Sequence, residues 1–286
     1  MLWGFFKKIV IADRLAIIVN LIYSNPTERT GPLLILATIL FAFQIYCDFS
    51  GYSDIAIGAS RIMGFKLMNN FRRPYFSRSI NEFWKRWHIS LSSWFKDYLY
   101  IPLGGRRVSI PRWYMNIMIV FLVSGLWHGA SWTFVIWGGL HGLYLIIEII
   151  TKSFKEKLLR ITKLIKFPRL IHLSEILLTF ILVSIGWIFF RANSISDAFY
   201  IIKNIFKGWG SGFSEVKLVA GGMRTLIAFA LIGFMGIVHV IQERGSAKQF
   251  LNKRPLVLRW AIYLAIMVLI VLFGVFNEVQ FIYFQF

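Results

Sequence analysis

Long stretches without a charged side chain alternate with short charged segments along this chain. Most of these stretches approach the length of about 20 residues that a helix needs to cross a hydrocarbon layer about 30 Å thick. The sequence has none of the ten-residue segments of alternating polarity that a membrane β-barrel requires. The pattern therefore predicts an all-α, polytopic helical membrane protein. The charge-free stretches are residues 31–47, 113–147, 176–190, 225–242 and 260–277.

The stretch over residues 113–147 predicts a broken helical hairpin. It is too long for one membrane span and slightly short for two spans of average length. Its middle contains Gly125 and Gly129 on either side of His128, and glycine permits a break in a helix or a close approach between helices. We therefore expect the chain to bend sharply near His128.

Residues 80–99 predict an amphipathic helix of about 20 residues, because apolar side chains recur there with helical spacing. Pro74 precedes this segment and Pro102 follows it, as expected at the boundaries of a helix. The segment carries too many charges to span a membrane. We expect it to lie at the membrane interface with its aromatic face turned inward. That face comprises Ile80, Phe83, Trp84, Trp87, Leu91, Trp94, Phe95 and Tyr98.

Two carboxylates interrupt an otherwise apolar region at residues 47–54. Asp48 and Asp54 lie there beside Gly51, which predicts a polar break that is tolerated at membrane depth only where protein or water surrounds it. Cys47 is the single cysteine, which excludes an internal disulfide, and we expect a small buried apolar residue. Residues 1–23 lack the pattern of a signal peptide and predict an amphipathic or first membrane helix.

The charge of the chain is strongly basic, with 32 Lys and Arg against 13 Asp and Glu. In a soluble domain this excess would suggest nucleic acid, but 57% of the residues are hydrophobic and no nucleic-acid-binding motif is present. The basic residues instead concentrate between the apolar stretches, in residues 72–112, 152–169 and 244–259. The positive-inside rule places these three segments in the cytoplasm and residues 191–223 outside. Membrane lipids, and no nucleic acid, are the expected surroundings.

Two histidines directly follow a tryptophan, His88 after Trp87 and His128 after Trp127. An ionisable side chain inside a bilayer is costly and is therefore a functional candidate. A neutral imidazole is also suited to act as a general base. His128 lies about 22 Å along its helix from Trp113, at 1.5 Å per residue, and so deep in the membrane and nearer the outer side.

Other roles for the histidines stay open at this point. His88 could fill the interface while bonded to a backbone carbonyl, and His128 could serve helix packing alone. A histidine pair could hold a metal ion or haem, although no motif for either is present. For His141 a packing role is the simpler interpretation. The sequence also contains no G-x-S-x-G elbow, P-loop or dinucleotide fingerprint, which weakens hydrolase, nucleotide-driven and redox functions.

Three segments together resemble the signature of the membrane-bound O-acyltransferase family, namely residues 83–92, 97–105 and 125–130. They are most similar to the bacterial branch that contains alginate O-acetyltransferase, and more distantly to the teichoic-acid D-alanyltransferases. The similarity runs in family order over nearly the whole chain. Further matching segments are residues 4–13, 46–54, 187–192 and 281–286.

The resemblance implies particular roles for residues of this chain. His128 matches the membrane-embedded histidine of the family, which implies a catalytic role, and His88 matches a second polar position on the cytoplasmic side. Trp87, Trp127 and Asp97 would then line the substrate channel. The resemblance implies no bound cofactor or metal. It implies a thioester acyl donor, such as acetyl-CoA or an acyl carrier.

The function implied by the resemblance is transfer of an acyl group, acetyl in the nearest branch, across the membrane to hydroxyls of a cell-envelope or exported polysaccharide such as alginate. Accessory envelope proteins that pass the acetyl group on are implied as partners. The implied location is the bacterial inner membrane. A non-catalytic polysaccharide or lipid-carrier transporter fits the composition equally well, and only the motifs separate the two.

The resemblance also bears on domain organisation. Residues 1–286 read as a single membrane-bound O-acyltransferase domain that lacks the additional N-terminal helices typical of the family. Because five or six spans leave little protein to enclose the polar residues 48–54, we expect this stretch alone to be inactive.

Overall fold

The computed structural model describes residues 1–243, 245, 247–276 and 281–282, and every regular element within them is helical. In this part of the chain six helices are long and apolar enough to cross a membrane. Each of the five charge-free stretches overlaps one or more of them, and the stretch over residues 113–147 is divided between two helices. The predicted all-α, polytopic membrane fold is therefore confirmed. The chain divides into two compact units, Met1–Met68 with Tyr200–Phe286, and Asn69–Phe199.

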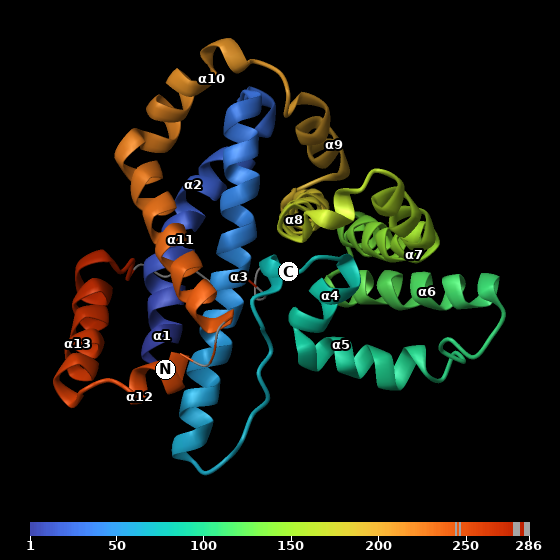
Figure 1. The fold of residues 1–286 in the computed structure, drawn as a ribbon. Coiled ribbons are helices and arrows are strands. Elements are labelled where there is room, and N and C mark those ends of the chain that lie inside the picture. The colour runs from blue at the N-terminus through green and yellow to red at the C-terminus, as the bar shows by residue number, and fades with distance from the viewer. Residues whose placement is uncertain (244, 246, 277–280, 283–286) are drawn as a thin grey trace. The chain divides into compact units, whose positions relative to one another are not determined.

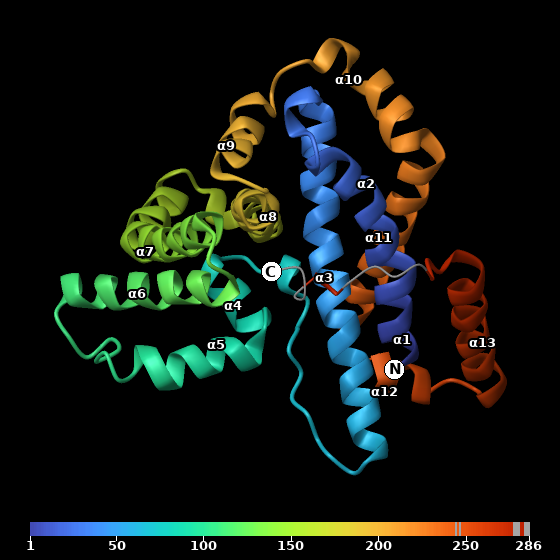
Figure 2. The ribbon, with the colours of Figure 1, turned by 180° about the vertical axis from the view of Figure 1, so that it is seen from behind.

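The first unit begins with a continuous helical stretch that packs along a long helix. The stretch consists of α1 (Leu2–Phe5), a π-helical segment (Phe6–Ala12) and α2 (Asp13–Tyr23), and it runs beside α3 (Gly31–Ile62), as Figures 1 and 2 show from opposite sides. Two glycines allow the close approach. A Cβ atom added to Gly4 would lie 2.6 Å from the carbonyl oxygen of Gly51. The helix predicted for residues 1–23 is thus confirmed.

The predicted polar break at residues 47–54 is wrong, because α3 continues through this segment as a regular helix. Lys8 Nζ lies 2.6 Å from Asp48 Oδ1 and 2.9 Å from Asp13 Oδ1. Lys7 Nζ lies 2.9 Å from Asp54 Oδ2. The neighbouring helical stretch therefore supplies the countercharges, and the backbone of α3 need not open to satisfy them. We call these five side chains the Lys7–Lys8 ion network.

The C-terminal helices complete the first unit. Two buried contacts join α3 to α11, one from Tyr46 Oη to His239 Nε2 at 3.1 Å and one from Cys47 Sγ to Met235 Sδ at 3.3 Å. Cys47 is fully buried, as predicted. The stretch predicted to reach residue 277 ends as a helix at Phe273, and residue 277 lies outside the described residues. The helices are α10 (Trp209–Glu215), a π-helical segment (Val216–Gly221), α11 (Gly222–Glu243), α12 (Ala247–Asn252) and α13 (Leu256–Phe273).

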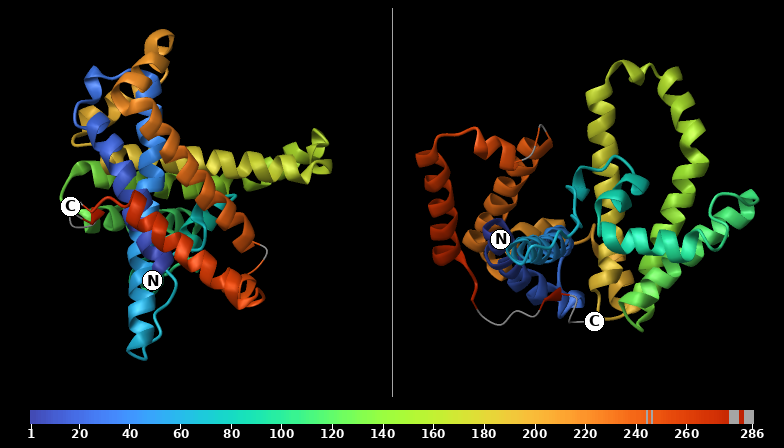
Figure 3. Two further views of the ribbon diagram at one scale, coloured as in Figure 1. Left: turned by 90° about the vertical axis from the view of Figure 1, so that its left-hand side faces the viewer. Right: turned by 90° about the horizontal axis from the view of Figure 1, so that it is seen from below.

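The second unit is built on three long helices and contains the predicted hairpin. The helices α6 (Ile110–His128) and α7 (Trp132–Ile161) are antiparallel and are joined by a short turn at Gly129, which confirms the predicted bend. Gly125 and Gly138 allow the two helices to touch, since a Cβ atom at either would collide with a backbone carbonyl of the other helix. The next helix, α8 (Pro168–Arg191), runs back and contacts α7, and the right-hand view of Figure 3 shows the two helices spread apart toward the turn that joins them.

The single amphipathic helix predicted over residues 80–99 is wrong, because it is broken at Trp87 and His88 into α4 (Ile80–Arg86) and α5 (Ile89–Phe95). His88 adopts a left-handed backbone conformation with φ 42°. The break is held by residues from earlier in the chain. The amide of Ile89 donates to the carbonyl of Asn70 at 3.0 Å, and the amide of Ser90 donates to the side chain of Asn70 at 3.0 Å.

The aromatic face of this segment is only partly buried. Phe83 and Trp87 lie in the core of the unit, whereas Trp94 and Tyr98 are exposed. The inward face predicted from the sequence is therefore confirmed for α4, and it is wrong for Trp94 in α5 and for Tyr98 beyond it. A π-helical segment (Lys96–Tyr100) follows α5. Short 3-10 turns lie at Pro26–Glu28, Pro74–Phe76 and Leu164–Lys166, and α9 (Ile195–Asn204) leads from the second unit back to the first.

The orientation across the membrane is a prediction that labelling can test. In a Cys47→Ala background, single cysteines at Ser109 and Thr162 should resist an impermeant thiol reagent in intact cells, because the positive-inside rule places both in the cytoplasm. A cysteine at Ser211 should react. Both Ser109 and Thr162 are exposed, so burial in the protein would not explain their protection. The reverse labelling pattern would contradict this topology.

Candidate active site

His128 is buried among aromatic rings from three helices. It is the last residue of α6, directly before the turn of the hairpin, and only 8% of its surface is exposed. Its ring centroid lies 5.1 Å from that of Trp137 on α7 and 5.1 Å from that of Phe190 on α8. The imidazole is thus held at a helix end, inside a water-poor aromatic enclosure. In such surroundings a neutral imidazole is favoured over its cation.

His88 lies at the break between α4 and α5, outside the candidate membrane spans. Its Nδ1 atom is 3.4 Å from the hydroxyl of Ser90. Burial lowers the pKa of His88 to about 4, because low-dielectric surroundings disfavour the charged form. This imidazole is therefore also neutral near pH 7 and available to accept or donate a hydrogen bond.

The structure brings the two predicted histidines into the same compact unit. A row of three buried indoles runs from Trp87, which directly precedes His88 in the sequence, to the ring of His128. The ring centroids of Trp87 and Trp187 are 5.0 Å apart, and those of Trp187 and Trp137 are 6.0 Å apart. Trp137 in turn contacts His128. Each of the three indoles is at most 2% exposed, so the row belongs to the buried core of the second unit.

The residues predicted to line a substrate channel fall in different places. Trp87 is buried in the indole row, as just described. Trp127 is 54% exposed and contacts the ring of His128. Asp97 is exposed in the π-helical segment that follows α5. Their role along a substrate path stays a prediction.

Two residues of the site, Trp137 and Trp187, were missed as site residues from the sequence alone. Trp187 begins one of the segments that resemble the family, but nothing in the sequence indicated that it lies between Trp87 and Trp137. Trp137 precedes His141 by four residues, which places both on the same face of a helix. From this spacing the sequence could have predicted that the ring of His141 packs beside that of Trp137.

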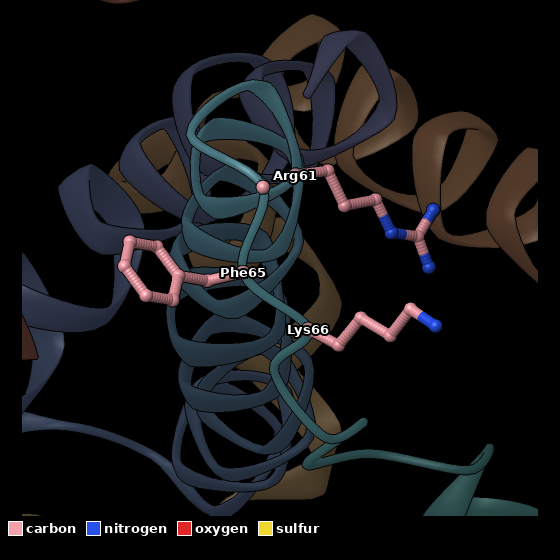
Figure 4. A pocket seen from close by; sticks show the side chains of 4 residues that line it. Arg61, Phe65 and Lys66 are labelled. Carbon is pink, nitrogen blue, oxygen red and sulfur yellow. The ribbon is translucent and has the colours of Figure 1, made fainter.

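A separate pocket lies at the C-terminal end of α3, within the first unit. It is lined by Arg61, Gly64, Phe65 and Lys66, and Figure 4 shows both cationic side chains extending to the same side while Phe65 points the other way. It contains none of the residues predicted for the site. Across the described residues, no three His, Cys, Asp or Glu side chains gather as metal ligands would.

Comparison with known proteins places these features in a family. Residues 1–191 match the family model described as MBOAT, membrane-bound O-acyltransferase family. The matched region includes both histidines of the site and all three indoles of the row. It also includes the Lys7–Lys8 ion network.

Several curated relatives are similar over most of this chain. A probable alginate O-acetylase AlgI of Pseudomonas aeruginosa is 41% identical over 82% of this chain and 44% of its own length. A peptidoglycan O-acetyltransferase of Helicobacter pylori is 40% identical over 71% of this chain and 37% of its own length. A teichoic acid D-alanyltransferase of Bacillus subtilis is 32% identical over 66% of this chain and 49% of its own length. The chain thus spans less than half the length of these relatives.

Proposed function

The chain belongs to the membrane-bound O-acyltransferase family, and on this premise we propose that the protein transfers an acyl group, acetyl in the first instance, to hydroxyls of a cell-envelope or exported polysaccharide. The relatives whose names contain an acetylase or acetyltransferase activity are the more similar ones, at 39–41% identity. The family match also favours acyl transfer over a non-catalytic transporter, since composition alone did not distinguish them.

The burial of His128 in its aromatic enclosure is the observation that carries this proposal. A neutral imidazole can take the proton of an acceptor hydroxyl as general base. The alcohol oxygen then attacks the thioester carbonyl of the donor, the new C–O ester bond forms and the C–S bond breaks. The departing thiolate recovers a proton from the imidazolium, so that the histidine returns to its neutral form. Exclusion of water by the surrounding rings would limit hydrolysis of the thioester.

His88 supports the same proposal from the interfacial side of the unit. It is neutral, lies at a break between two helices, and directly follows Trp87, the first indole of the row that leads to His128. We assign it a role in receiving the acyl donor, either acetyl-CoA or an acyl carrier. Transfer through accessory envelope proteins and a location in the bacterial inner membrane belong to the same proposal.

Deletion of the gene tests the proposed activity directly. Cells without it should lose ester-linked acetate from one envelope or exported polysaccharide, and the gene supplied in trans should restore it. The measurement is acetate released by mild alkali from purified polymer fractions. Alginate and peptidoglycan are the first fractions to compare, because they appear in the names of the two acetylating relatives. Unchanged acetate in every fraction would contradict the proposal.

A further inference from the structure

A part-buried hydrogen bond connects the segment that carries His88 to the hairpin that carries His128. The indole Nε1 of Trp84 on α4 donates to Nδ1 of His141 on α7 at 3.3 Å. The two residues are 57 positions apart in the chain. His141 is fully buried, whereas Trp84 is half-buried.

The bond determines which nitrogen of His141 carries the proton. An indole N–H can only donate, so Nδ1 must accept and the proton of the neutral ring lies on Nε2. That Nε2 atom has no hydrogen-bond partner among the described residues. It faces Gly186 on α8, where an added Cβ atom would lie 2.8 Å from it. A purely packed position would be filled better by an apolar side chain, because a buried polar atom without a partner costs free energy.

His141 contacts two aromatic residues, one that lies beside His128 and one that precedes His88 in the chain. Its ring centroid lies 5.2 Å from that of Trp137, and Trp137 contacts His128. On the other side Trp84 lies three residues before Trp87 and four before His88, at the end of the same short helix. His141 therefore lies between the helix that leads to His88 and the indole that holds His128.

A second polar contact between α4 and α7 runs from the amide of Asn81 to Oε2 of Glu148 at 3.2 Å, and it is exposed to solvent. Ring contacts favour certain geometries but permit sliding, whereas a hydrogen bond is directional. The Trp84–His141 bond is thus suited to set the register of the two helices.

We propose that His141 is a positioning residue for acyl transfer, which acts through its bond with Trp84 to set the location of His88 relative to His128. This inference rests on the proposed function and deepens it. His141 does not itself touch the reacting groups in this scheme. Misplacement of a catalytic group by about 1 Å can cost about 100-fold in rate, so loss of the bond should reduce turnover.

Paired substitutions test the role in membrane vesicles that contain the protein. Trp84→Phe keeps an aromatic ring but removes the donor, and His141→Leu removes the acceptor. Each should lower kcat for acetyl transfer from acetyl-CoA by about 10–100-fold, with little change in KM. The double variant should lose no more than either single variant, because both remove the same interaction. His141→Asn, which keeps an acceptor near the position of Nδ1, should restore most of the activity.

A control and a second readout separate positioning from folding. Glu148→Gln weakens the exposed contact between the same two helices and should leave kcat unchanged. Histidine labelled with ¹⁵N should show one ring whose Nδ1 signal shifts in Trp84→Phe, whatever the activity. Wild-type kcat in both single variants, or additive losses in the double variant, would overturn the proposal. Absence of transfer by the wild-type protein, with the Nδ1 shift present, would instead contradict the proposed function and this role with it.

Discussion

Replacement of His128 by alanine is expected to lower acyl transfer by about 10²–10⁴-fold, the usual loss when a general base is removed. Expression and membrane insertion should stay normal, because the substitution lies at a helix end and adds no charge. The measurement is ester-linked acetate on the polymer in cells, together with acetyl transfer in isolated membranes.

The matched comparison for this prediction is His141→Ala. Both histidines are buried against Trp137, so the two substitutions remove similar packing. His141→Ala should cost far less activity, since His141 acts through position and not through proton transfer. Equal losses from the two variants, or normal acetylation after His128→Ala, would contradict the assignment of His128 as the base.

The second large effect is expected on stability, from replacement of Lys8 by methionine. Lys8 bridges Asp13 and Asp48, whose side chains are only 7% and 4% exposed. Methionine has a similar shape but no charge, so it would leave two buried carboxylates without their cation. Breaking a buried ion pair in this way costs about 3–5 kcal/mol. Thermal unfolding in detergent, followed by tryptophan fluorescence, should show a clearly lowered midpoint.

The same substitution at Lys155 provides the control. Lys155 forms an ion pair with Glu175 at 2.7 Å, but its side chain is 50% exposed. An exposed pair contributes about 0–1 kcal/mol, so Lys155→Met should hardly change the midpoint. Neutralising the carboxylates in the Lys8→Met background, with Asp13→Asn and Asp48→Asn, should recover part of the loss. A loss at Lys155 as large as that at Lys8 would show that burial of the network is not what matters.

The Lys7–Lys8 ion network is a feature that the sequence predicted only in part. The carboxylates at Asp48 and Asp54 were recognised as a polar feature in an apolar stretch, and the need for surrounding protein was predicted correctly. The predicted break was wrong, because the partners Lys7 and Lys8 lie about 40 residues away in the sequence. Only the packing of two helices brings them beside α3.

The error at Trp87 and His88 is the reverse one. There the sequence predicted a continuous helix, and the structure has a break. Periodicity over residues 80–99 is helical throughout, and no glycine or proline interrupts it. The chain nevertheless turns there, because Asn70 supplies both a backbone and a side-chain acceptor to the start of α5. Helical spacing alone could not reveal a competing partner that lies 20 residues upstream.

The sequence by itself determined the membrane spans, the bend of the hairpin near His128 and both candidate histidines. These features are local, because a helix in a membrane satisfies its backbone hydrogen bonds within its own segment, and length and composition therefore suffice to predict it. The tertiary structure decided which side chains meet. The row from Trp87 through Trp187 to Trp137, and the bond between Trp84 and His141, join α4 and the break that follows it to α7 and α8. Such contacts depend on how helices pack, and no periodicity within one helix specifies its partner on another.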